Sequence, residues 1–153
     1  MKPTPKGWPR ISCSLYYQDA SKAIDWLCSA FGFEVRLKVE GEGGRIEHSE
    51  LVFGDGLIMV SDAGRAKEKG YPGASPKSLN GANTINLMVY VDDAIAHCER
   101  ARKAGAKILM APADQFYGDR AYRAEDPEGH IWYFGTYRPG AHWDNTTGQS
   151  SPA

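Results

Sequence analysis

The chain has 153 residues, 42% of them hydrophobic and 24% charged, which suits one packed core and excludes a disordered chain. Its 18 basic and 19 acidic side chains leave a formal net charge of -1, so there is no chain-wide basic field for nucleic acid or an anionic membrane. No apolar run approaches the roughly 20 residues of a membrane span, and the first ten residues lack a signal-peptide core. We therefore expect a cytoplasmic protein.

The first half of the chain predicts a βαβββ unit. Apolar and polar residues alternate from Ile11 to Tyr17, as in a two-faced strand. Asp19 is placed to cap a helix that Gly32 ends. Three strands follow at about 33–39, 45–53 and 57–60, linked by glycine turns.

The middle of the chain, about residues 63–83, is rich in Gly, Pro, Ser and Lys. We interpret it as an unusually long connecting loop.

The second half predicts the same unit again. A strand alternates from Ile85 to Val91, Asp92 and Asp93 are the helix caps, and Gly105 is the stop. Strands follow at about 106–110, 121–125 and 130–136. Residues 138–153 have no periodicity, and we expect a flexible tail.

A fixed offset links the two halves. Adding 73 to the positions of Asp19 and Gly32 gives those of Asp92 and Gly105. Such a repeat is typical of two copies of one supersecondary unit that share a core. We expect a single domain made of modules at about 10–62 and 84–137.

Three segments carry a resemblance to a known family. They are YVDD at Tyr90 to Asp93, the KAGAKI that ends the following helix, and DPEGHIWYF at Asp126 to Phe134. With the doubled βαβββ order, they resemble the glyoxalase/bleomycin resistance protein/dioxygenase (vicinal oxygen chelate) superfamily. The segments 48–62 and 117–134 are similar to its PhnB-like branch. The resemblance implies an α+β fold of paired βαβββ modules forming a cup around a ligand cavity, and a homodimer.

The resemblance also implies where a metal would lie. Enzymes of the family hold a divalent metal with His or Glu near the start of the first strand, and Glu four residues after the final-turn glycine, of each module. In this chain the positions fall on Ser12, Val60, Asn86 and Tyr133. None is a His or a carboxylate, so we expect no cofactor and disfavour a divalent metal. A displaced site using Glu47, His48 and Glu50 is the alternative.

The strand faces opposite the aliphatic ones predict the ligand-binding residues. These are Ser12, Ser14, Tyr16, Asn86, Met88, Tyr90 and Tyr133. Tyr117, Arg120 and Tyr122 join them from the segment before the last turn, where Arg120 is suited to clamp a carboxylate or phosphate. Two alternatives stay open: a filled core, and an Arg120 tied to Asp119, Asp126 or Glu128 in a surface network.

His48 is the candidate catalytic residue, because histidine is the side chain suited to acid/base chemistry near neutral pH, and a purely structural histidine is the alternative. We predict a protein that binds a small organic molecule without the family's metal, for sequestration of a drug or metabolite. The alternative is a lyase, isomerase or dioxygenase-type enzyme that uses His48 or a displaced divalent metal. We expect no nucleic acid or membrane partner.

Overall fold

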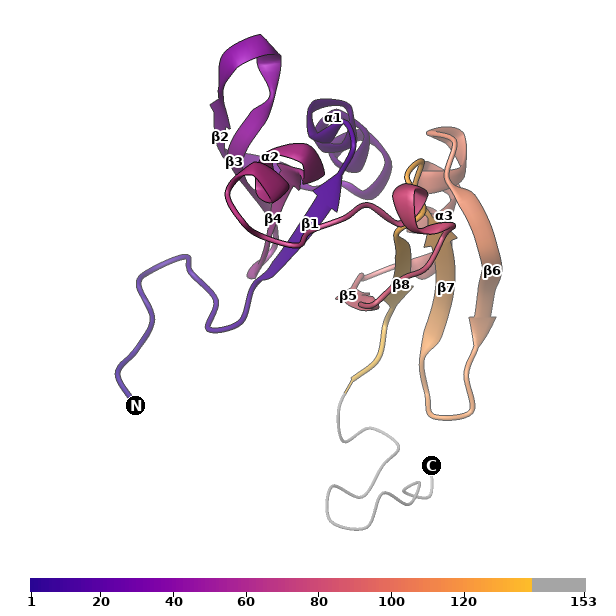
Figure 1. The fold of residues 1–153 in the computed structure, drawn as a ribbon. Coiled ribbons are helices and arrows are strands. Elements are labelled where there is room, and N and C mark those ends of the chain that lie inside the picture. Colours follow the sequence, from indigo (N-terminus) through magenta and orange to yellow (C-terminus); the bar gives the residue numbers. More distant parts are fainter. Residues whose placement is uncertain (139–153) are drawn as a thin grey trace. The chain divides into compact units, whose positions relative to one another are not determined.

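Figure 1 shows the chain as a ribbon in a computed structural model, which describes residues 1–138. The chain divides into two compact units: 1–82 with 127–130, and 83–126 with the residues from Ile131 on. Each unit contains one four-stranded mixed sheet with few helices, so the predicted fold class is confirmed. Apart from Arg138, the predicted flexible tail lies outside the described residues.

The first unit holds the first sheet, in the strand order β1-β4-β3-β2. Its elements are β1 (Cys13–Tyr17), α1 (Ala20–Phe31), β2 (Glu34–Glu40), the 3-10 turn η1 (Glu42–Gly44), β3 (Ile46–Phe53), β4 (Gly56–Asp62), α2 (Ala63–Glu68) and the 3-10 turn η2 (Pro76–Leu79). The outer pair β1 and β4 is parallel, and the other pairs are antiparallel.

Helix α1 has the bounds that the sequence predicts. The Asp19 carboxylate accepts a hydrogen bond from the backbone N–H of Lys22 at 3.1 Å, and Gly32 ends the helix in the left-handed region with φ 83°. Its buried stripe includes Ile24 and Leu27. The stripe covers one face of the first sheet, where Leu15 is also buried.

The second unit holds the second sheet, in the strand order β5-β8-β7-β6. Its elements are β5 (Leu87–Tyr90), α3 (Ala94–Lys103), β6 (Lys107–Asp114), β7 (Arg120–Glu125) and β8 (Ile131–Gly135). Of the two predicted caps of α3, Asp93 is the one that accepts from the helix, at 3.0 Å from both Ile95 N and Ala96 N. Beneath α3 the rings of Trp132, Tyr122 and Phe134 are fully buried.

The middle segment is not the continuous loop that its composition predicts. Strand β4 leads directly into α2, and η2 follows after seven intervening residues, 69–75. Ser75 caps η2 by accepting from the backbone N–H of Lys77 at 3.3 Å, and a proline opens the turn. Local capping therefore orders part of this glycine- and proline-rich stretch.

The turn between β7 and β8 belongs to the first unit. The Glu128 carboxylate accepts hydrogen bonds from Gln18 N at 2.7 Å, Asp19 N at 2.9 Å and the Ser75 hydroxyl at 2.6 Å. His130 Nε2 donates to the Tyr16 carbonyl at 2.9 Å. The DPEGH segment thus anchors the chain leading into α1. Within residues 1–138, no helix is long and apolar enough to cross a membrane.

Candidate ligand-binding site

The second sheet presents one face to α3, and among the described residues of its own unit no helix packs on the opposite face, which we call the open face of the second sheet. The strand register brings one residue from each strand into a row across it: Met88, Tyr133, Arg123 and Met110. Met88 is 55% exposed although its side chain is apolar. Large apolar side chains left exposed on a sheet face mark a surface suited to a ligand.

A chain of hydrogen bonds lies at Tyr133 on this face. The Tyr133 hydroxyl donates to Asp119 Oδ2 at 2.8 Å, so the Tyr117 hydroxyl, 2.7 Å from it, donates to Tyr133. Asp119 is buried, and its other oxygen accepts from Thr136 N at 2.7 Å. Burial raises the pKa of Tyr133, and the hydrogen bonds with Tyr117 and Asp119 raise this pKa further. Tyr133 therefore stays a neutral hydroxyl with its proton directed inward.

Arg123 stands beside Tyr133 and borders a hollow of about 370 Å³. Its guanidinium carbon lies 5.7 Å from the centroid of the Tyr133 ring, a cation–π distance. The hollow is lined by Asn83, Thr84, Ile85, Asn86, Arg123 and Ile131. The predicted ligand residue Asn86 thus lies in a hollow together with a guanidinium.

The first sheet has a matching row on the face away from α1. It consists of Ser14, Met59, Glu50 and Leu37. Glu50 is mostly buried; its carboxylate lies 3.2 Å from His48 Nε2 and 3.2 Å from Arg36 Nε. His48 shares this face with Glu50 and is half-exposed. The structure therefore gives His48, the candidate catalytic residue, a carboxylate neighbour.

The remaining predicted residues of the two sheets lie as follows. Ser12 directly precedes β1, and Tyr16 shares the face of Ser14. A side chain at Gly73 would meet the Tyr16 ring at 2.6 Å, so residue 73 covers part of this tyrosine. Tyr90 is 43% exposed on the same face as Met88.

Two predicted ligand residues lie on the other face of the second sheet, toward α3. Tyr122 is fully buried under α3, where its hydroxyl lies 2.6 Å from His97 Nδ1 and its ring stacks on Phe134. Burial raises the pKa of Tyr122. The alternation of β7 explains the error, since Tyr122 and Arg123 are neighbours and point to opposite faces.

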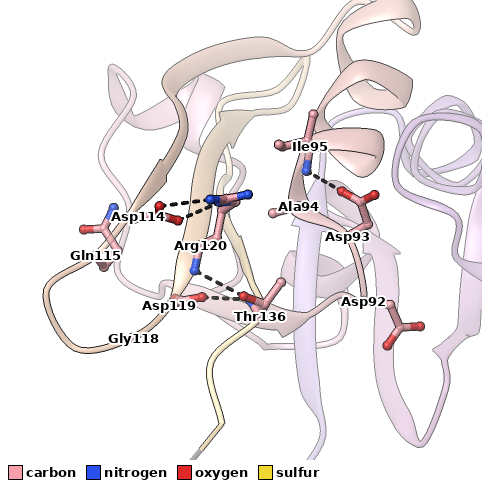
Figure 2. Close-up of a pocket in the computed structure, with 10 residues that line it drawn as sticks. All are labelled: Asp92, Asp93, Ala94, Ile95, Asp114, Gln115, Gly118, Asp119, Arg120 and Thr136. Carbon is pink, nitrogen blue, oxygen red and sulfur yellow. Dashed lines mark hydrogen bonds and ion pairs between the residues drawn. The ribbon is translucent and has the colours of Figure 1, made fainter. Parts of the chain in front are cut away.

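Arg120 also lies on the α3 side. Figure 2 shows it at the start of α3, where Nε and Nη2 on one edge of its guanidinium donate to the two carboxylate oxygens of Asp114. The hollow that these residues line has a volume of about 590 Å³. The two donor–acceptor distances are 2.6 and 2.9 Å, and the ion pair lowers the pKa of Asp114. Arg120 thus forms a surface ion pair, but with Asp114 and not with Asp119, Asp126 or Glu128 as the sequence predicted.

The residues at the family's metal positions do not fit a metal. Counting from the turn glycine places Val60 at a metal position, but Val60 pairs with Leu15 on the α1 side of the first sheet. On the face away from α1, the residue level with Ser14 is Met59. A thioether, a serine, an asparagine and a hydrogen-bonded tyrosine are poor ligands for a catalytic divalent metal.

The displaced metal site is not assembled either. Glu47 points to the opposite face from His48 and pairs with Arg65 and Lys69. Within residues 1–138, no three His, Cys, Asp or Glu side chains are grouped to hold a metal ion.

The ligand-binding residues predicted from the sequence do not include Arg123, Met59, Met110 or Asp119, although Asp119 and Arg123 belong to the cluster of aromatic, acidic and guanidinium groups before the last turn. Arg123 was within reach, because it alternates with Tyr122 and Ala124 in a strand whose partner is the strand of Tyr133. The strand register and the loop path decide whether a residue reaches the site in the case of Met59, Met110 and Asp119, and no local pattern of the sequence encodes them.

Comparison with known protein families agrees with a fold of two four-stranded sheets. The model of the glyoxalase/bleomycin resistance protein/dioxygenase superfamily matches residues 11–134. The chain belongs to this superfamily. The predicted family is thus confirmed, while the PhnB-like branch stays a prediction.

Several proteins are similar over most of the chain. The Mycobacterium bovis protein Mb0911c is 33% identical over 127 residues, which are 83% of this chain and 82% of the relative. The structure of TioX from Micromonospora sp. ML1 is 29% identical, covers 86% of this chain and 100% of its own, and has a TM-score of 0.66. TnmS3, an antibiotic binding protein from Streptomyces sp. CB03234, is 21% identical, with coverages of 80% and 90% and a TM-score of 0.59. The two structures have the fold described here.

Proposed function

We propose that this protein binds a small, largely apolar organic molecule without the family's catalytic metal and acts by sequestering a drug or metabolite. The observation that supports this most is the open face of the second sheet. There exposed Met88 and Tyr90 and half-buried Met110 offer apolar and aromatic surface, and Arg123 and Asn86 offer hydrogen-bond donors. Such a mixture suits orientation of an apolar ligand by a few polar contacts.

Sequestration needs complementarity and no reacting group. The residues at the family's metal positions supply no His or carboxylate, which agrees with binding as the whole function. The antibiotic-binding protein TnmS3 shares the fold, so the fold supports this role elsewhere.

Calorimetric titration with a panel of planar aromatic antibiotics tests the proposal. We expect at least one to bind with the same affinity before and after treatment with EDTA. Met88→Glu should weaken that binding by about tenfold, because a carboxylate on the open face must be desolvated against the ligand. Ile95→Glu is the matched control, since Ile95 is a similarly exposed apolar residue on α3.

Elemental analysis of protein purified without chelators completes the test. We expect well under one divalent metal ion per chain. A stoichiometric metal whose removal abolishes ligand binding would contradict the proposal, as would equal effects of Met88→Glu and Ile95→Glu.

A second candidate function is an enzyme that uses His48. The observation in its favour is the 3.2 Å approach of His48 Nε2 to Glu50, which is the arrangement of an oriented general base. However, Arg36 shares the same carboxylate. If any ligand is turned over, His48→Ala should abolish turnover while ligand affinity is kept; unchanged turnover would exclude this role.

The proposal includes a cytoplasmic location, a homodimer and membership of the PhnB-like branch. These follow from the sequence and from the family resemblance of segments 48–62 and 117–134. Size-exclusion chromatography with light scattering tests the dimer.

A further inference from the structure

We infer that Arg123 and the hollow beside it form a carboxylate-binding subsite, so that the ligand of this protein is an apolar molecule bearing a carboxylate. This inference rests on the proposed binding function and specifies its ligand class. The first step is the state of the guanidinium. Arg36 and Arg120 are each paired with a carboxylate, whereas the structure gives Arg123 no ion pair within residues 1–138.

The second step is how Arg123 is held. Its guanidinium lies over the Tyr133 ring, and Tyr133 is itself fixed by its hydrogen bond to buried Asp119. A guanidinium stacked on an aromatic face keeps its N–H edge available. That edge matches the two oxygens of a carboxylate, which it binds in a bidentate manner.

The third step is the chemistry of the hollow. Its lining contains no acidic residue: besides Arg123, there are two asparagines, one threonine and two isoleucines. Asn83 already accepts from Ile131 N at 3.3 Å, so its amide is held in place. The nearest acid on the same face of β7, Glu125, is paired with Lys107 at 3.2 Å. An anion that enters the hollow therefore meets hydrogen-bond donors, and no carboxylate lines the hollow to repel it.

The fourth step is the position of the subsite. Arg123 lies between Tyr133 and Met110 in the row across the open face. A ligand whose carboxylate is bound by Arg123 thus lays its apolar part on exposed Met88 or half-buried Met110, while the buried Tyr133 ring holds the guanidinium from below. The geometry favours one molecule with both chemical features.

The experiment is an NMR titration of the full chain with 2-naphthoate and with its neutral counterpart 2-naphthamide. We expect 2-naphthoate to shift the side-chain resonances of Arg123 and Asn86. It should bind about tenfold more tightly than 2-naphthamide, because a charge-assisted hydrogen bond replaces a neutral one. Inorganic phosphate alone should bind more weakly than 2-naphthoate, because it has no apolar part.

Two variants of equal charge separate the subsite from general electrostatics. Arg123→Gln should weaken binding of 2-naphthoate by about tenfold and leave 2-naphthamide unchanged. Lys103→Gln, which removes an exposed cation from the last turn of α3, should change neither. Unchanged fingerprint spectra show that both variants fold.

Several results would overturn the inference. They are equal binding of the acid and the amide, equal effects of the two variants, tighter binding of phosphate, and no shift at Arg123. If both naphthalenes shift Met88 and Tyr133 without any dependence on Arg123, the carboxylate subsite is excluded while the binding function stands. If neither 2-naphthoate nor 2-naphthamide binds although planar antibiotics do, the carboxylate subsite is again excluded while the binding function stands.

Discussion

Asp119 determines the direction of the hydrogen bonds at the open face of the second sheet. Its buried carboxylate accepts from the Tyr133 hydroxyl and from the backbone N–H of Thr136. The Tyr133 hydroxyl therefore donates its proton inward to Asp119, and the Tyr117 hydroxyl donates to the oxygen of Tyr133. Gly135 makes the arrangement possible, because a Cβ at this position would lie 2.6 Å from the Asp119 carboxylate.

Replacement of Asp119 should therefore cost stability. We predict that Asp119→Ala lowers the free energy of unfolding by about 3 kcal/mol, because two donors lose a charged acceptor in a buried place. Asp119→Asn should cost less, because its amide oxygen still accepts from Thr136 N. Urea unfolding followed by circular dichroism measures both changes.

Asp92→Ala is the control for this prediction. Asp92 is exposed in the same unit, and its replacement should change the free energy of unfolding by less than about 0.5 kcal/mol. Equal losses for Asp92→Ala and Asp119→Ala would contradict the role given to Asp119.

At the scale of elements, the sequence predicts the strands and helices but not their register. Asp19 and Gly32 set the bounds of α1 because capping is a local property. Counting from glycine turns, in contrast, selects Val60, whereas the sheet places Met59 on the face away from α1. The turns of the two modules differ in length, and one residue is enough to exchange the faces of a strand.

The same limit explains which parts of the candidate site were predicted. Alternation within a single strand is enough to place Met88, Tyr90 and Tyr133 on the face opposite the aliphatic residues. The sequence alone therefore predicts that they share the open face of the second sheet. Tyr122 was assigned to the site from a local concentration of aromatic and guanidinium groups, which carries no information on strand face. Its burial under α3 is a tertiary property.

The turn between β7 and β8 acts on α1 although it follows α1 by about a hundred residues. We predict that Glu128→Ala lowers the free energy of unfolding by about 1 to 2 kcal/mol, because Gln18 N, Asp19 N and the Ser75 hydroxyl all lose their acceptor. Hydrogen exchange should rise first in the peptide that covers Gln18 and the first turn of α1.

Glu42→Ala is the matched control, because Glu42 is an exposed glutamate in η1. Its replacement should leave both the stability and the exchange of α1 unchanged. If Glu128→Ala speeds exchange in β7 and β8 but not at α1, the anchoring role of this turn is wrong.

At the scale of the whole molecule, two buried tyrosines make stability depend on alkaline pH. The folded-state pKa values of Tyr122 and Tyr133 are raised above the ordinary value near 10, in both cases chiefly by burial. Their contribution is complete below about pH 10, where both states are neutral. It is lost as the pH rises above 10, because the unfolded chain then releases protons that the folded chain retains.

We therefore predict that the free energy of unfolding falls above about pH 10, by up to about 1.4 kcal/mol per pH unit for each such tyrosine. Tyr133→Phe should be less stable at pH 8, because Tyr117 and Asp119 lose a partner, but should show a shallower decline between pH 10 and 11.5. Tyr71→Phe, at a side chain that is 61% exposed, should keep the slope of the parent chain. Urea midpoints at each pH give the slopes, and tyrosinate absorbance should reach its full value only on unfolding. Equal slopes for Tyr133→Phe and Tyr71→Phe would mean that Tyr133 ionises in the folded protein, and the inward hydrogen bond to Asp119 would then be wrong.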